Sequence, residues 1–151
     1  MNKKYIEKIQ KNIMELLPEG DSQHKAFLLK DCCSELSRLV ASWIKENDKS
    51  SCQTILKGDN VCDTNKSHDI LASVNDGKVY LIDPTIWQFF PDEDLMLIGE
   101  YASLDEAIDA AAKKYGGQWQ ESENLKQSSP DDKENWLKII KENIKDGGFD
   151  L

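Results

Sequence analysis

The 151-residue sequence has few of the features that mark membrane proteins or nucleic-acid-binding proteins. No hydrophobic run approaches the ~20 residues that an α-helix needs to cross a bilayer, and the first residues lead into an amphipathic helix rather than the apolar core of a signal peptide. A net charge of −9 disfavours nucleic acid and anionic membranes as main partners. With 39% hydrophobic and 31% charged residues, the composition is that of a soluble globular domain.

The sequence also lacks an evident disulfide framework or metal-binding motif. Cys32 and Cys33 are adjacent, and a bridge between neighbours is strained. Cys52 and Cys62 could close a short loop, but a reduced, cytosolic setting is the simpler expectation. Together with His68 they are conceivable zinc ligands, yet their spacing matches no common pattern and a fourth ligand is missing. We therefore expect neither a metal nor a cofactor.

The segment 31–44 is the one around which the rest of the chain is organised. Its apolar residues recur at helical spacing, and Cys33 shares their face, three positions before Leu36. Asp31 is the expected N-cap, which puts Cys33 in the first turn, where exposed backbone N–H groups and the helix dipole favour a thiolate. The alternative is that Cys32 and Cys33 are two small apolar residues of a core helix.

The remaining chain predicts a mixture of helices and short strands. The first expected elements are a helix over 3–17, a strand from Cys52 to Leu56 and a hairpin over 68–83. An aromatic segment over 84–91, expected to pack on the core, and a strand from Leu95 to Tyr101 follow. The last elements are a helix capped by Ser103 and closed by Gly116–Gly117, and a helix from Ser129–Pro130. Residues 120–128 have no apolar spacing and predict a polar linker. We therefore divide the chain into a domain over 1–119 and an appendix over 120–151. The amphipathic helix of the appendix, whose apolar stripe is Trp136, Ile139, Ile140 and Ile144, either docks on the domain or binds a partner.

The hairpin is the clearest local signal. An Asp-Gly pair at 76–77 separates two apolar runs and predicts a two-residue turn. This register makes His68 and Asp83 diagonal neighbours on one face of the sheet, within reach of a hydrogen bond. A three-residue bulged turn would instead put them on opposite faces, so the register tests whether the two side chains can meet.

Three residues, Cys33, His68 and Asp83, form a candidate catalytic triad. A thiol at a helix N-terminus, with an imidazole oriented by a carboxylate, is the arrangement needed for nucleophilic acyl transfer. His68 and Asp83 each have an ordinary structural interpretation as well, in which His68 only begins a strand and Asp83 only ends one. The other histidine, His24, has no evident carboxylate partner and is expected at the surface.

The order of these pieces resembles the papain-like, transglutaminase-like toxin and effector domains. The matching segments are Asp31–Ser37, Ser67–Leu71 and Leu81–Phe89, with fifteen residues from His68 to Asp83, and the resemblance covers about residues 25–117. Within this group, the chain is most similar to the glutamine deamidase domain of the Pasteurella dermonecrotic toxin and related bacterial effectors. The resemblance implies an α+β, papain-like fold in which a central cysteine-bearing helix and N-terminal helices pack on a small antiparallel sheet.

The resemblance also implies an activity and further site residues. The deamidase branch converts a glutamine side chain of a target protein to glutamate, the papain branch cleaves peptides, and the transglutaminase branch uses an amine in place of water. The triad is common to all three. Gln23 could supply an oxyanion-hole amide, and Gln88 could lie on the substrate side. Papain-like helices carry a small residue four positions after the nucleophile, which Ser37 supplies for Cys33, so Cys32 is the second choice.

These observations favour a cysteine hydrolase that deamidates a protein glutamine as a bacterial effector or toxin. Such a protein would lack a Sec signal, reach its target by a specialised secretion system or within a larger toxin, and act in the cytoplasm of the target cell. The first alternative is a cysteine peptidase of papain-like type. The second is a catalytically silent interaction module that binds a partner through its acidic surface or its last helix.

Overall fold

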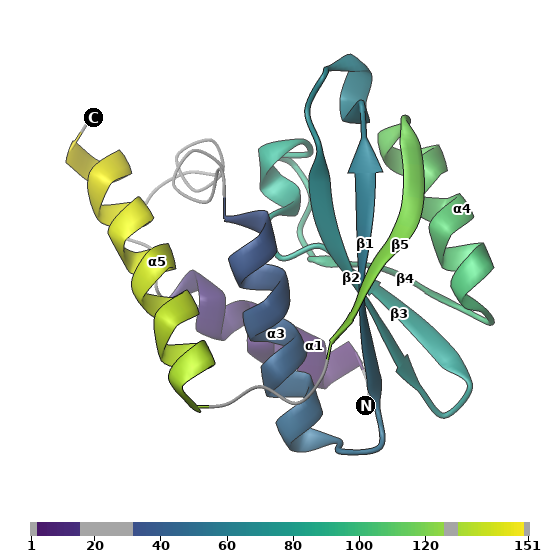
Figure 1. Ribbon diagram of the computed structural model, residues 1–151, viewed down its shortest axis with the longest axis horizontal. Helices are drawn as coiled ribbons and strands as arrows, with labels where there is room; N and C mark the ends of the chain where they lie inside the picture. Colours follow the sequence, from purple (N-terminus) through teal and green to yellow (C-terminus); the bar gives the residue numbers. More distant parts are fainter. Residues whose placement is uncertain (1–2, 16–31, 126–129, 150–151) are drawn as a thin grey trace.

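The chain folds around one antiparallel sheet with helices on both of its faces (Figure 1). The computed structural model describes residues 3–15, 32–125 and 130–149. The sheet has five strands in the order β4-β3-β2-β1-β5. The strands are β1 (Cys52–Asp59), β2 (His68–Asn75), β3 (Lys78–Ile82), β4 (Leu97–Tyr101) and β5 (Gln118–Leu125). The α+β class predicted from the sequence is confirmed.

The hairpin of β2 and β3 has the register that the Asp-Gly turn predicts. Asn75 pairs with Lys78, and Ala72 pairs with Leu81. Asp76 and Gly77 both have positive φ, as the two central residues of a type I′ turn require. The turn therefore puts alternate residues of the two strands on a common face, as far as the ends where His68 and Asp83 lie.

One face of the sheet is covered by α1 (Lys3–Met14) and α3 (Cys33–Asn47), and α5 (Pro130–Phe149) packs against α3 on the side away from the sheet (Figure 1). The three helices and the sheet share one apolar core. Its buried members include Ile6, Ile9, Ile13, Leu36, Leu39, Val40, Ile44, Ile55, Leu71, Ile82, Ile140 and Ile144. Two short 3₁₀ helices, η1 (Val61–Asp63) and η2 (Ile86–Gln88), lie in the connections. Ile86 and Trp87 of η2 are buried, which confirms that the aromatic segment packs on the core.

The other face is covered by α4 (Leu104–Tyr115), which joins β4 at one edge of the sheet to β5 at the opposite edge (Figure 1). Ser103 caps α4 by accepting a hydrogen bond from the Glu106 N–H, and Gly116 ends it at φ +71°. Both predicted caps are confirmed. The second core lies between α4 and the sheet, and its buried members are Leu56, Val61, Ile70, Ala72, Val79, Leu81, Ala107, Ala111 and Tyr115.

The predicted polar linker is wrong over most of its length, because Gln118–Leu125 forms β5 at the edge of the sheet. Its side chains are mostly exposed, so the strand has no apolar pattern to reveal it. β5 pairs with β1 through backbone hydrogen bonds, with a register shift between Ile55 and Leu56. The strand predicted to end at Leu56 also continues to Asp59, because its last residues pair with both neighbours.

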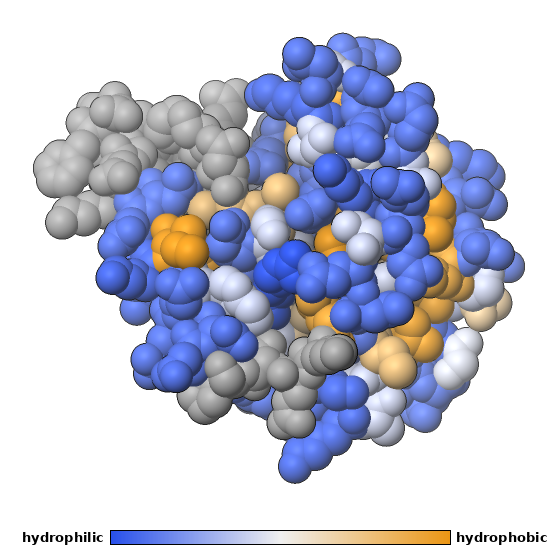
Figure 2. Space-filling view, viewed as in Figure 1, coloured by the Kyte–Doolittle hydropathy of each residue, from blue (hydrophilic) through white to orange (hydrophobic). Residues whose placement is uncertain are grey.

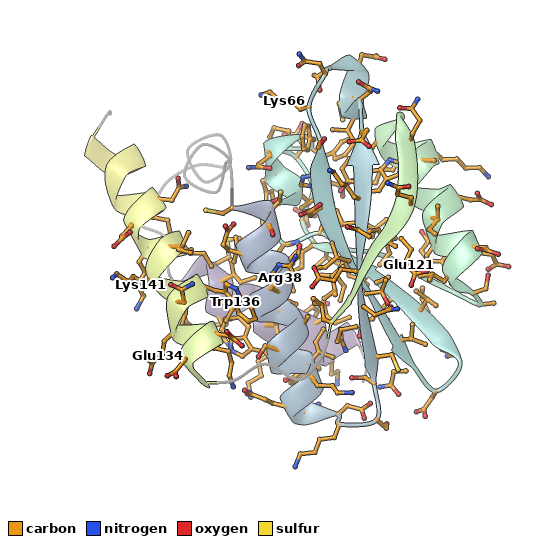
Figure 3. The ribbon with its side chains drawn as sticks, in the orientation of Figure 1. Arg38, Lys66, Glu121, Glu134, Trp136 and Lys141 are labelled. Atoms are coloured by element: carbon orange, nitrogen blue, oxygen red, sulfur yellow. The ribbon has the colours of Figure 1, made fainter. Side chains whose placement is uncertain are left out.

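The last helix docks on the domain. Ile140 and Ile144 are buried in the first core, and Trp136 packs against it. Figure 3 shows Trp136 pointing toward α3, while Glu134 and Lys141 point away from it. Ile139, which the sequence placed in the apolar stripe, is 38% exposed. The boundary at residue 120 therefore separates no independent unit, since β5 and α5 both belong to the packed domain.

The surface is predominantly polar. Figure 2 shows polar residues over most of the visible face, with apolar residues exposed in separate places between them. Isolated exposed apolar residues are normal for a folded protein. Among the helices of the described residues, none has the length and apolar character needed to cross a bilayer.

Candidate active site

Cys33 is the first residue of α3, as the helical pattern predicts. The N-cap is Cys32 rather than Asp31, and Asp31 lies outside the described residues. Cys32 is 1% exposed and belongs to the first core, whereas Cys33 is half-buried. The two cysteines thus differ in access to solvent, and Cys33 is the more accessible of the two.

Ser37 fixes the position of α3 on β2. It lies one helical turn after Cys33, is fully buried, and donates a hydrogen bond from its hydroxyl to the Asp69 carbonyl at 3.4 Å. Asp69 is the neighbour of His68 on β2. A small side chain at position 37 lets the helix approach the strand closely, and this approach brings the end of α3 to the start of β2.

His68 is the first residue of β2 and pairs with Gly58 of β1. Its side chain is almost completely buried, and the Nε2 atom lies 2.7 Å from Oδ2 of Asp83. The diagonal contact predicted from the hairpin register is therefore present. Asp83 directly follows β3 and is fully buried.

The His68 ring bridges the carboxylate and the thiol. A side-chain hydrogen bond joins Cys33 to His68. Since Nε2 is engaged by Asp83, the nitrogen left for the thiol is Nδ1. The structure thus brings Cys33, His68 and Asp83 together in the order that a thiol–imidazole–carboxylate triad requires.

Two further residues hold the Asp83 carboxylate. Thr85 donates its backbone N–H to Oδ1 at 3.0 Å and its hydroxyl to the same oxygen at 3.3 Å. The phenol of Tyr115, at the end of α4, donates a short hydrogen bond to Oδ2. Both carboxylate oxygens are therefore fully engaged by donors, which compensates the burial of the charge.

Asp83 controls the protonation of His68. Burial by itself lowers the His68 pKa, but the charge of Asp83, the hydrogen bond to it and the contact with Cys33 outweigh burial and raise the pKa to about 10. The imidazole is consequently charged at neutral pH.

Aromatic rings surround the imidazole. The Phe89 ring meets the His68 ring edge-on with centroids 4.8 Å apart, and the Tyr115 ring lies at 5.6 Å. Beyond Phe89, an open hollow of about 480 Å³ is lined by residues 89–93. The rings exclude water from the His68–Asp83 pair, and the hollow leaves room beside the site.

The remaining predicted site residues have different outcomes. Gln23 lies outside the described residues. Gln88 is half-buried in η2, and its side-chain oxygen lies 3.4 Å from the Thr85 hydroxyl. It is therefore next to the residue that holds Asp83. Cys32 is a core residue.

Cys52 cannot share a metal with His68. Cys52 begins β1 and pairs with Val74, whereas His68 pairs with Gly58, six residues further along β1. At about 3.3 Å per residue, this separation is roughly 20 Å. Cys62 follows β1 at the His68 end, so a bridge between Cys52 and Cys62 would span the whole strand. Each of the four cysteines is a free thiol.

Sequence reasoning missed Thr85 and Tyr115. Thr85 stands two residues after Asp83, the spacing at which an aspartate accepts from a backbone N–H in an Asx turn, so a local signal existed. No local sequence signal pointed to Tyr115, because it reaches Asp83 only through the crossover of α4 from one edge of the sheet to the other.

Comparison of the chain with protein families, with characterised proteins and with solved structures found no match in any of the three.

Proposed function

We propose that the protein is a cysteine-dependent amidohydrolase in which Cys33 is the nucleophile, His68 the general acid and base, and Asp83 the carboxylate that orients the imidazole. The observation that carries this proposal is the position of the His68 ring, which is hydrogen-bonded to Asp83 and is also acted on by Cys33, one of the groups that raise its pKa. A structural histidine needs one partner, whereas this ring joins a buried carboxylate to a half-buried thiol at a helix N-terminus.

The reaction begins from a thiolate–imidazolium pair. The Cys33 thiolate attacks an amide carbonyl carbon, forming a C–S bond, and the carbonyl electrons move onto oxygen. Backbone N–H groups in the first turn of α3 point toward this oxyanion, because they lack partners within the helix. The oxyanion then collapses, the C–N bond breaks, and His68 gives its proton to the leaving nitrogen.

Water completes the cycle. After losing its proton, the neutral imidazole removes one from water, whose oxygen attacks the thioester carbonyl. Collapse of this second intermediate releases a carboxylate and restores the thiolate and the imidazolium. Asp83 keeps the Nε2 proton in place throughout, so that Nδ1 performs each transfer.

The proposed substrate is a glutamine side chain of a protein, and the product is glutamate with release of ammonia. This choice rests on the resemblance of three segments, 31–37, 67–71 and 81–89, to glutamine deamidase domains. The open hollow lined by residues 89–93 supports a macromolecular substrate, since Phe89, whose ring contacts His68, belongs to its wall. Delivery as a bacterial effector or toxin belongs to the same proposal.

The first test measures the thiol itself. In a Cys52→Ser/Cys62→Ser background, which removes the exposed and half-buried competing thiols, Cys33 should react fastest with iodoacetamide, and Cys32 should react slowly because it is buried. His68→Ala should lower the Cys33 rate at least about tenfold. Equal rates with and without the imidazole would contradict the triad.

The second test measures the product. Target proteins exposed to the wild type should gain about one dalton per modified glutamine, as an amide NH₂ is replaced by OH, and Cys33→Ala should abolish the gain. Cys32→Ala and Cys52→Ala serve as matched cysteine controls and should retain activity. Fragments would identify a peptidase, and incorporation of an added amine would identify a transglutaminase. Full activity in Cys33→Ala would refute the proposal.

A further inference from the structure

Tyr115 contacts the triad at one specific atom. Its phenol donates to Oδ2 of Asp83, which is also the oxygen that accepts from His68 Nε2 at 2.7 Å. The other oxygen, Oδ1, is occupied by the two donors of Thr85. Two donors, one neutral and one charged, therefore share the oxygen that orients the catalytic imidazole.

The side chain of Tyr115 is buried among aromatic rings. It is 2% exposed and stacks among Phe90 at 5.1 Å, Trp119 at 5.2 Å and Phe89 at 6.2 Å between ring centroids. Burial, followed by the charge of Asp83, raises the pKa of its hydroxyl. The phenol consequently stays protonated, and so remains a donor, wherever the thiolate–imidazolium pair exists.

An ordinary structural role explains only part of this arrangement. A buried phenol must find an acceptor, since an unpaired hydroxyl costs about 1–3 kcal/mol. Any backbone carbonyl would meet that need, as the Trp43 carbonyl does for Tyr5. Tyr115 instead binds the carboxylate oxygen that faces His68, where its donor changes the charge density seen by the imidazole.

We propose that Tyr115 is a positioning residue of the triad. Its hydroxyl withdraws charge from Oδ2 of Asp83 and so weakens the hydrogen bond between this oxygen and the Nε2 proton of His68. This inference rests on the proposed function, because it concerns the imidazole that must release a proton to the leaving nitrogen. If Asp83 bound the imidazolium without this competition, the proton would be held more firmly and its transfer from Nδ1 would be slower.

The ionisable groups that act on this cluster come from several elements. Asp83 and Cys33 act on His68, and Asp83, Cys62 and Glu93 act on Tyr115. Lys114, next to Tyr115 on α4, pairs with Glu93 at 2.7 Å. Asp83 is the common member and forms the direct hydrogen bonds, so a variant at Tyr115 reports mainly on the Asp83–His68 contact.

The test is Tyr115→Phe, which keeps the ring and removes only the donor. The sequence has two histidines, so a His24→Asn background leaves one imidazole signal in NMR spectra. With the competing donor gone, the Nε2 proton should move further downfield, because its hydrogen bond to Oδ2 becomes stronger. The alkaline limit of the imidazolium, which is the pH at which the His68 signal reports loss of its proton, should rise by about half a pH unit or more, because a stronger hydrogen bond to Oδ2 favours the charged ring.

Two comparisons keep the test decisive. Tyr5→Phe removes a phenol hydroxyl that binds the Trp43 carbonyl, and it should change neither readout. Replacement of tyrosine by 3-fluorotyrosine makes the phenol a stronger donor without changing the fold. It should therefore shift the Nε2 proton upfield and lower the alkaline limit of the imidazolium. This measurement remains available if Tyr115→Phe does not fold.

The outcomes separate this inference from the proposed function. An unchanged chemical shift of the Nε2 proton in Tyr115→Phe overturns the positioning role, whatever the reactivity of Cys33. Where the phenylalanine variant does not fold, an unchanged chemical shift in the fluorotyrosine protein overturns it. Opposite shifts in the two proteins support it. If the proton shifts while Cys33→Ala retains full deamidation, Tyr115 positions His68 but the amidohydrolase proposal is wrong.

Discussion

The hydroxyl of Ser37 donates to the backbone carbonyl of Asp69, and this contact joins the cysteine-bearing helix to the histidine-bearing strand. Cys33 lies one turn before Ser37, and His68 lies one residue before Asp69. The contact between Ser37 and Asp69 therefore also brings Cys33 close to His68. The proposed triad depends on this junction, because Cys33 lies on α3 and His68 on β2.

A larger residue at position 37 should separate the thiol from the imidazole. Ser37→Leu would force several carbon atoms into a site with no exposed surface, at a cost of about 1–3 kcal/mol of unfolding free energy. The Cys33 alkylation rate should fall with it, because the helix must move away from β2. Urea unfolding and iodoacetamide kinetics measure the two effects.

The matched control is Ser37→Ala, which removes the hydroxyl and keeps the small volume. It should cost about 0.5–1.5 kcal/mol and leave the alkylation rate within about twofold of the parent. A leucine variant that alkylates as fast as the alanine variant would show that the helix position does not set the geometry of the pair.

The sequence could predict the parts of the site that local chemistry determines. The Asp-Gly turn at 76–77 sets the register of the hairpin, and the register brings His68 to Asp83 without help from any other element. The start of α3 was also predictable, since the apolar stripe counts back to Cys33. In both cases a few neighbouring residues contain the whole signal.

The missing parts depend on contacts between distant segments. β5 is polar and mostly exposed, so only its backbone pairing with β1 identifies it as a strand. Tyr115 meets Asp83 because α4 crosses the sheet, and no spacing in the sequence records that path. Trp136 and Ile140 matched the stripe of the last helix, but whether that stripe met the domain or a partner could not be decided from periodicity.

Replacement of Asp83 by asparagine should lower the His68 pKa. Both oxygens of Asp83 face donors, so the amide NH₂ would meet a donor in either orientation. Without the carboxylate charge, burial dominates and the imidazole becomes neutral at pH 7. The alkylation rate of Cys33 at this pH should fall about tenfold or more, as the thiolate loses its counter-ion.

Asp69→Asn is the matched control for this change, because it removes a carboxylate next to His68 in sequence, whereas the His68 ring pairs with Asp83. Its alkylation profile should resemble that of the parent. Equal losses in the two variants would mean that general acidity near the site, rather than the Asp83 contact, activates Cys33.

The same pair makes the stability of the protein depend on pH. The folded pKa of His68, about 10, exceeds its ordinary value of 6.5, so its contribution is complete below pH 6.5 and is lost as the pH rises through 10. The unfolding free energy of the wild type should therefore fall more steeply over this range than that of Asp83→Asn. Urea midpoints at several pH values measure the difference, and parallel curves would contradict the coupling.

Substitutions on the two faces of α5 should distinguish a docked helix from an appendix. Ile140 is fully buried, so Ile140→Ala should lower the unfolding free energy by about 2–5 kcal/mol. Ile139 is 38% exposed, and Ile139→Ala should change it by no more than about 0.5 kcal/mol. Both should unfold in a single transition; a separate early transition for α5 would show that it folds apart from the sheet.

Gly58 allows the close approach of Trp119 to β1, the strand that pairs with His68. A Cβ at position 58 would lie 2.4 Å from the Trp119 ring, whose N–H is fixed by a 2.9 Å hydrogen bond to the Gly116 carbonyl. Gly58→Ala should therefore cost about 1–3 kcal/mol in urea unfolding and slow Cys33 alkylation, because Gly58 pairs with His68. In a Trp119→Ala background the same change should cost much less, since the ring that it would strike is gone. An equal cost in both backgrounds would place the strain in the strand itself rather than at the indole.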